Sequence, residues 1–183
     1  MKKFELTAES KINIFGKKLF RIKALISFGS VKEGETGGWV EKEENLNQSG
    51  DAWVFDNAEV FDNAEVSGNA WAFGNARVFD NARVFGNAWV LGNAEVFGNA
   101  WVSGNAWVSG NADYATIHGF GTQFRTTTFF RCKDKQVKVS CGCFYGTISE
   151  FREQVKNTRN GKIAEEYLMI ADLMEKHFAK EAK

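Results

Sequence analysis

The 183-residue sequence predicts a mostly β protein whose central part winds as a coil of short parallel strands. A six-residue phrase, Val-x-Gly/Asp-Asn-Ala-x, repeats with few departures from about Gln48 to Asp113. A short period of this kind predicts stacked units, because one repeat can bury its apolar residues only against its neighbours. Proline is absent from the whole chain, as expected where a ladder needs every backbone N–H. Hairpin and helix patterns flank the repeats on either side.

The phrase has a simple physical interpretation. Side chains alternate along a strand, so inward residues four positions apart need a turn between them if the period is six. Gly adopts positive φ without cost, and Asn and Asp do so more readily than most residues. Val and Ala are therefore expected to fill the interior of the coil, while Gly/Asp-Asn makes each turn. Stacked coils would place each Asn over another Asn, where the side-chain amides can form hydrogen bonds.

This pattern resembles the hexapeptide-repeat left-handed parallel β-helix, in which three hexads form one triangular coil. The resemblance covers roughly residues 39–113, and the Val-x-Gly/Asp-Asn-Ala-x phrase carries it. The sequence departs from the family at the second position, which is often Phe where the family often has Gly. The expected fold is therefore a left-handed β-helix over residues 39–113, between an N-terminal β cap (1–38) and a C-terminal hairpin with two helices (114–183).

Three hexads per coil sort the outward side chains into columns. One edge then carries a long apolar strip: Trp53, Trp71, Trp89, Trp107, Phe55, Phe73 and Leu91. An exposed apolar strip of that size usually marks an interface. Since proteins of the resembled family are usually trimers, the resemblance implies a homotrimer packed along this edge. The alternative is that the terminal segments fold back over the strip.

Arginines stand beside aromatic residues on the other edges of the coil. Arg83, Phe85, Phe97 and Trp101 fall on one edge, and Arg77 on the next. Flat aromatic faces can stack on a nucleobase, and a guanidinium can bind a phosphate through two donors. The alternative is that both arginines form surface ion pairs with glutamates of the same columns, which are Glu59, Glu65 and Glu95.

The flanking segments carry local signals of strands and helices. Residues 12–15 and 19–22 flank Gly16-Lys17, which predicts an N-terminal hairpin. Residues 125–132 and 136–141 predict a second hairpin after the coil. Its basic residues include Arg125 and Arg131, which are added to the candidate ligand contacts, with a solvated basic face as the alternative.

Two helices are predicted at the C-terminal end. Thr147 with Glu150 forms a capping-box signature for the first helix. A second helix is expected from about Asn160. Its apolar stripe at helical spacing consists of Ile163, Tyr167, Ile170, Met174 and Phe178.

The arrangement also resembles a set of uncharacterised bacteriophage and prophage proteins. The shared stretches are residues 20–25 with 38–46, and residues 128–132 with 142–147. This resemblance covers nearly the full chain and implies a phage origin, but it carries no established chemistry.

Catalytic and metal chemistry have little support in the sequence. Acyltransferases of the resembled family use a histidine of the coil as general base with a CoA-type donor, but the two histidines here, His118 and His177, lie outside the repeats. Cys132, Cys141 and Cys143 could bind zinc as thiolates, but a fourth ligand is missing and buried inert thiols are the favoured alternative. We therefore expect no catalytic residues, no metal and no cofactor.

The bulk composition narrows the function classes. The formal net charge is zero, which gives no electrostatic basis for general nucleic-acid or membrane-surface binding. The start of the chain has no apolar run typical of a signal peptide, so a cytoplasmic protein is expected. The leading hypothesis is a non-catalytic, phage-encoded homotrimer that sequesters a small anionic, nucleotide-type ligand such as a host immune signal. The alternatives are a structural or protein-binding module acting on a host protein and, less favoured, an acyltransferase.

Overall fold

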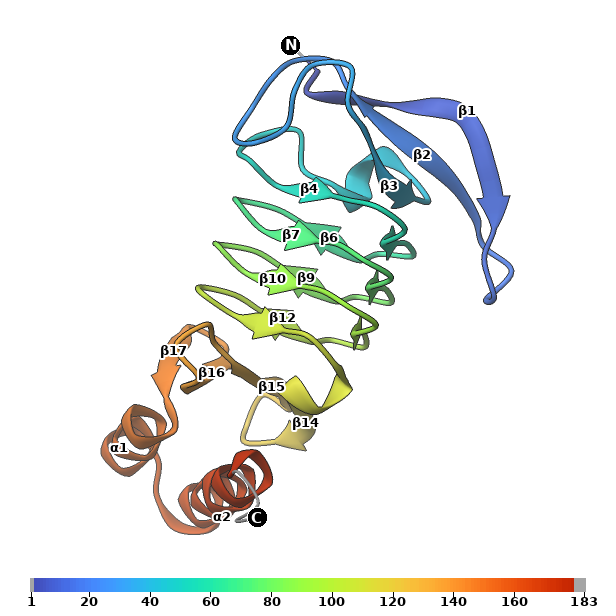
Figure 1. Cartoon of the computed structure of the whole chain (residues 1–183). Coiled ribbons are helices and arrows are strands. Elements are labelled where there is room, and N and C mark those ends of the chain that lie inside the picture. The colour runs from blue at the N-terminus through green and yellow to red at the C-terminus, as the bar shows by residue number, and fades with distance from the viewer. Residues whose placement is uncertain (1, 180–183) are drawn as a thin grey trace.

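The computed structural model describes residues 2–179. A stack of short coils forms the centre, a β-hairpin lies at its N-terminal end, and a small sheet with two helices lies at its C-terminal end (Figure 1). This order of segments matches the mostly β architecture predicted from the repeat.

The central stack consists of ten two-residue strands on three faces. They are β4 (Trp53–Val54), β5 (Glu59–Val60), β6 (Glu65–Val66), β7 (Trp71–Ala72), β8 (Arg77–Val78), β9 (Arg83–Val84), β10 (Trp89–Val90), β11 (Glu95–Val96), β12 (Trp101–Val102) and β13 (Trp107–Val108). Strands three apart in this series pair in parallel, so that Trp53 lies beside Trp71 and Glu65 beside Arg83. Three hexads per coil are therefore confirmed.

Valine and alanine fill the interior of the stack. The repeat valines from Val54 to Val108 are 0% exposed and the repeat alanines from Ala52 to Ala106 are 0–1% exposed. Each corner turns through a residue with positive φ, such as Asp56 (51°) and Gly86 (71°). Asparagine amides bond along the corners as predicted, with Nδ2 to Oδ1 distances of 3.1–3.2 Å in the pairs Asn63–Asn81, Asn81–Asn99, Asn69–Asn87 and Asn75–Asn93.

The N-terminal hairpin continues one face of the stack. Strands β1 (Phe4–Ile12) and β2 (Lys18–Ala24) are antiparallel, so the predicted hairpin with a turn at Gly16 is confirmed. The prediction of a strand at residues 12–15 is wrong, because residues 13–15 belong to the turn. Strand β3 (Thr36–Val40) pairs antiparallel with β2 on one side and parallel with β5 on the other. A short 3-10 helix, η1 (Glu43–Asn45), follows. The edge of the first coil is therefore paired on this face, as a capping segment requires.

The N-terminal segment also covers part of the aromatic surface. Trp53 points out of the stack, but Phe4 and Phe28 pack on it with ring centroids 6.1 and 5.3 Å away, and it is 0% exposed. The expectation that Trp53 belongs to an exposed strip is therefore wrong, because the terminal segment folds back over the first coil.

Lys3 fastens the same segment to the stack. Its ammonium donates to the backbone oxygens of Gly50 (3.3 Å) and Ala52 (2.9 Å), and it lies 4.8 Å from the ring centre of Phe28. Burial lowers the pKa of Lys3 to about 8, against the opposing charge of Asp51.

The C-terminal segment contains more strands than the two-stranded hairpin that the sequence predicted. After the 3-10 helix η2 (Asn111–Asp113), four antiparallel strands follow: β14 (Tyr114–Phe120), β15 (Arg125–Arg131), β16 (Val137–Cys141) and β17 (Phe144–Thr147). The predicted hairpin is β15–β16, and the strands on either side of it were missed. The sheet joins the last coil through a bridge between Ala106 and Cys132 and through a 3.0 Å bond from Trp101 N to Thr128 Oγ1.

Two helices close the end of the molecule. Helix α1 (Ile148–Thr158) begins with the predicted capping box, in which Glu150 N donates to Thr147 Oγ1 (3.2 Å) and Thr147 N to Glu150 Oε2 (2.6 Å). Helix α2 (Gly161–Phe178) packs its predicted stripe on α1 and on the sheet. In the part of the chain that the structure describes, no helix is long and apolar enough to span a bilayer.

Candidate functional site

Two adjoining hollows lie where the last coil meets the C-terminal sheet. Their volumes are about 660 and 340 Å³, and both are lined by Trp101, Ser140, Gly142 and Cys143. The larger is completed by Asn99, His118, Gln123, Phe124, Arg125 and Thr126, and the smaller by Phe85, Gly86, Ser103, Gly104, Phe144 and Tyr145. We call the two hollows together the Trp101 groove.

Trp101 forms the aromatic wall of this groove. It is the last residue of a column that contains Glu65 and Arg83, so no further coil covers its C-terminal side. The guanidinium carbon of Arg83 lies 5.7 Å from the indole centre, and Phe85 meets the ring edge-on at 6.1 Å. Both neighbours hold the indole in place while 39% of the residue stays exposed.

Arg125 brings a positive charge to the same groove. It begins β15, and its side chain passes closely over Gly142, where a Cβ would lie 2.5 Å from Arg125 Nη1. Gly142 has a φ of +60°, so glycine serves both the turn and the approach of the guanidinium. Neither hollow has a carboxylate in its lining. The groove therefore favours an anion.

The other polar side chains of the groove can donate or accept hydrogen bonds, but they do not form a hydrogen-bonded pair of a base and a nucleophile. His118 Nδ1 and Thr126 Oγ1 are 3.3 Å apart. Among residues 2–179 no hydrogen bond joins His118 to a carboxylate or to Cys143, which is exposed. General-base catalysis needs the base oriented against a nucleophile or a substrate proton. The arrangement thus fits binding better than acyl transfer.

Only three of the seven predicted ligand contacts, Phe85, Trp101 and Arg125, line the groove. Arg83 lies beside Trp101 but is not part of the lining. Arg77 lies on another face and pairs with Glu95 (2.7 Å) and Glu59 (3.7 Å), so the ion-pair alternative is confirmed for this arginine.

The other two predicted contacts also lie elsewhere. Phe97 ends a column of stacked phenylalanines, 5.2 Å from Phe79, and is 45% exposed. Arg131 lies 3.3 Å from Asp113 and donates to the backbone oxygen of Phe178 at 2.9 Å. Arg131 therefore holds the end of α2 against the end of the stack.

The groove residues that sequence reasoning missed come from the strands of the C-terminal sheet, such as Ser140 and Tyr145, and from the turns between them. Gln123 and Phe124 lie between β14 and β15, and Gly142 and Cys143 lie between β16 and β17. Phe124 is 65% exposed and has a φ of 47°. A large aromatic residue just after Gly119 and Gly121 was the signal available in the sequence, because such a residue in a glycine-rich turn has little core to join.

The rest of the tryptophan strip remains partly open. Phe55 meets Trp71 edge-on at 5.2 Å, and Phe73 meets Trp89 at 5.8 Å. Trp107, Trp89, Trp71, Phe55, Phe73 and Leu91 are all half-buried. The strip is therefore shorter and less exposed than predicted, but it is continuous below the N-terminal cap.

The described residues contain no cluster of side chains suited to a metal ion. Within residues 2–179, no three side chains of His, Cys, Asp or Glu gather so as to hold a metal ion. Cys132 is buried, and burial raises the pKa of its thiol to about 11, which disfavours the thiolate.

Residues 18 apart, or three hexapeptides, lie side by side in parallel strands and in the asparagine ladders, and this spacing identifies the fold of the coil. It is a hexapeptide-repeat β-helix. The YdcK β-solenoid repeat family matches residues 76–92, which lie within this β-helix. No curated protein matches the chain. The β-helix thus supplies a rigid wall, and the C-terminal sheet supplies the charge, of the Trp101 groove.

Proposed function

We propose that this protein is a non-catalytic binding protein that sequesters a small anionic, nucleotide-type ligand in the Trp101 groove. The observation that carries the proposal is the pairing of a half-open indole with Arg125 in a hollow that has no carboxylate in its lining. A nucleobase gains about 1–3 kcal/mol by stacking on an aromatic side chain. A guanidinium binds phosphate through charge-assisted hydrogen bonds.

The kind of nucleotide follows from the resemblance to phage and prophage proteins. A phage protein with a binding groove and no catalytic pair is suited to removing a host immune signal from solution. Cyclic di- and oligonucleotides and cyclic ADP-ribose isomers are the candidate signals, since each combines a base with phosphate.

Calorimetric titration with these cyclic nucleotides tests the proposal. We expect one of them to bind, with about a tenfold loss of affinity in Trp101→Ala and in Arg125→Ala. The matched controls are Phe97→Ala, an exposed aromatic outside the groove, and Lys135→Ala, a cation on the β15–β16 turn. Absence of heat with every nucleotide, or equal losses in the controls, would overturn it.

Assembly is the second part of the proposal. The half-buried strip that includes Trp71, Phe73 and Leu91 supports a homotrimer packed along this face. Light scattering is expected to give about three times the chain mass of 20.5 kDa. Leu91→Asp should shift the protein to monomer, because a carboxylate would be buried without a partner. Ile14→Asp, at a site 76% exposed on the hairpin tip, should not. A wild-type monomer at micromolar concentration contradicts this assembly.

A structural or protein-binding module is the second candidate function. Met169 (70% exposed) and Leu173 (57% exposed) lie one turn apart on the outer side of α2, where a host protein would dock. This candidate predicts one stoichiometric partner in a pull-down and no heat with any nucleotide.

A further inference from the structure

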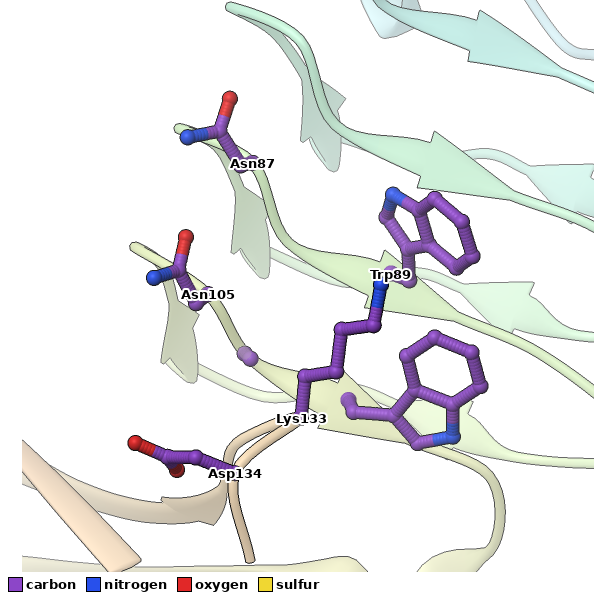
Figure 2. A pocket seen from close by; sticks show the side chains of 7 residues that line it. Asn87, Trp89, Asn105, Lys133 and Asp134 are labelled. Atoms are coloured by element: carbon purple, nitrogen blue, oxygen red, sulfur yellow. The ribbon is translucent and has the colours of Figure 1, made fainter. Parts of the chain in front are cut away.

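A third hollow lies on the tryptophan face, at the C-terminal end of the β-helix. Its volume is about 480 Å³, and it is lined by Asn87, Trp89, Asn105, Ala106, Trp107, Lys133 and Asp134. Figure 2 shows Lys133 extending toward Trp89, with Asn87, Asn105 and Asp134 on the other side of it. None of these residues lines the Trp101 groove.

The turn between β15 and β16 builds one wall of this hollow. Lys133 N donates to the backbone oxygen of Asn105 (3.1 Å), next to the bridge between Cys132 and Ala106. Asp134 Oδ1 accepts a 3.0 Å bond from Gln136 N, which fixes the turn. The backbone of Lys133 is therefore tied to the last coil, and the Asp134 side chain is fixed within the same turn.

The aromatic wall changes its geometry at the same place. Trp71 and Trp89 are nearly parallel, at 10°, whereas Trp89 and Trp107 are tilted by 32° with ring centroids 4.9 Å apart. Lys133 Nζ lies 5.6 Å from the centre of Trp89 and 5.9 Å from that of Trp107. The ammonium lies within cation–π distance of both rings, so this end of the strip carries a positive charge as well as apolar surface.

The asparagine ladder also ends here. Asn69 Nδ2 donates to Asn87 Oδ1 at 3.1 Å, but in the described residues no side-chain bond continues from Asn87 to Asn105. Both amides are exposed. The donors of Asn87 and the whole amide of Asn105 are thus available at the hollow.

We propose that this hollow binds a sugar ring of an uncharged glycan. Lys133 and Asp134 offset each other in charge, unlike the lining of the Trp101 groove, so an anion has no net advantage here. Amide, carboxylate and ammonium groups supply both donors and acceptors, which neighbouring hydroxyls of a sugar match. The indoles supply apolar surface for the C–H groups of the ring.

Nuclear magnetic resonance of the indole N–H groups tests the site in the full chain. The probes are chitotriose, cellotriose and maltotriose at millimolar concentration, with signals assigned by single Trp→Phe variants. We expect at least one sugar to move the Trp89 and Trp107 signals and to leave the Trp101 signal in place. Since Trp101 reports the nucleotide groove, the outcome at one site is independent of the outcome at the other.

Variants of exposed residues separate binding from folding. Asn105→Ala and Lys133→Ala should each raise Kd about fivefold, as expected for the loss of one hydrogen-bonding group. Asn93→Ala, a ladder asparagine outside the lining, and Lys135→Ala, on the same turn, should leave Kd unchanged. Unmoved Trp89 and Trp107 signals with all three sugars would overturn the proposal, as would equal weakening in the two controls.

Discussion

Replacing Val90 with aspartate should unfold the β-helix, whereas the same change at the adjacent Leu91 should leave it folded. Val90 is 0% exposed inside the stack, where a carboxylate would meet only valine and alanine. An unpaired buried charge costs several kcal/mol even after its pKa rises. Since whole domains are stable by about 5–15 kcal/mol, Val90→Asp should remove most of the stability.

The adjacent position is the matched control for this prediction. Leu91 points outward and is half-buried, so its aspartate stays in contact with water in a single chain. Circular dichroism melts and urea unfolding of both variants measure the difference. Equal destabilisation of the two would contradict the strict alternation of side chains that defines the coil.

The coil could be predicted from the sequence because its contacts repeat a local rule. Val90 lies over Ala72 and under Val108, and every such contact joins residues one coil apart. The phrase therefore determines the interior, the turns and the asparagine ladders together. Nothing in this rule depends on how the two ends of the chain fold.

The ends could not be predicted in the same way because their contacts join distant residues. Phe4 covers Trp53, and Thr128 accepts a bond from Trp101, across pairs that share no repeat position. An outward residue of a coil has no intrinsic partner, so tertiary packing alone decides whether it is covered. The strands β14 and β17 were missed for a related reason, since they are the edge strands of the sheet and edge strands carry weaker patterns.

Arg77 and Arg83 show how well the residues one coil above and below a side chain predict its contacts. Arg77 has Glu59 on one side and Glu95 on the other in its column, and it forms ion pairs with both. Arg83 has Trp101 on its C-terminal side and lies against that ring. The column neighbours predicted the ion pairs of Arg77, but among the described residues Arg83 forms no salt bridge with its own column neighbour Glu65. The hollow beside Trp101 depends on the C-terminal sheet.

Replacing Gly104 with leucine should detach the C-terminal sheet from the β-helix and abolish the nucleotide binding that we propose for the Trp101 groove. Gly104 has a φ of +62°, and a Cβ at this position would overlap the hydroxyl of Tyr145 in β17. The variant therefore carries the strain of a left-handed side chain, about 1–3 kcal/mol, and also displaces Tyr145 from the groove wall. Hydrogen exchange should show loss of protection in β15 to β17.

Gly98→Leu separates backbone strain from the loss of docking. Gly98 has nearly the same φ, +68°, but a Cβ there meets nothing within 4 Å. Gly98→Leu should therefore lower the unfolding temperature. It should reduce neither the hydrogen-exchange protection of β15 to β17 nor the affinity for the proposed nucleotide ligand. Tyr145→Ala in the Gly104→Leu background should restore part of the protection, because both the hydroxyl and the ring carbon Cζ (2.6 Å) of Tyr145 obstruct the added Cβ. If the two glycine variants behaved alike, the close contact between the coil and the sheet would not be what shapes the Trp101 groove.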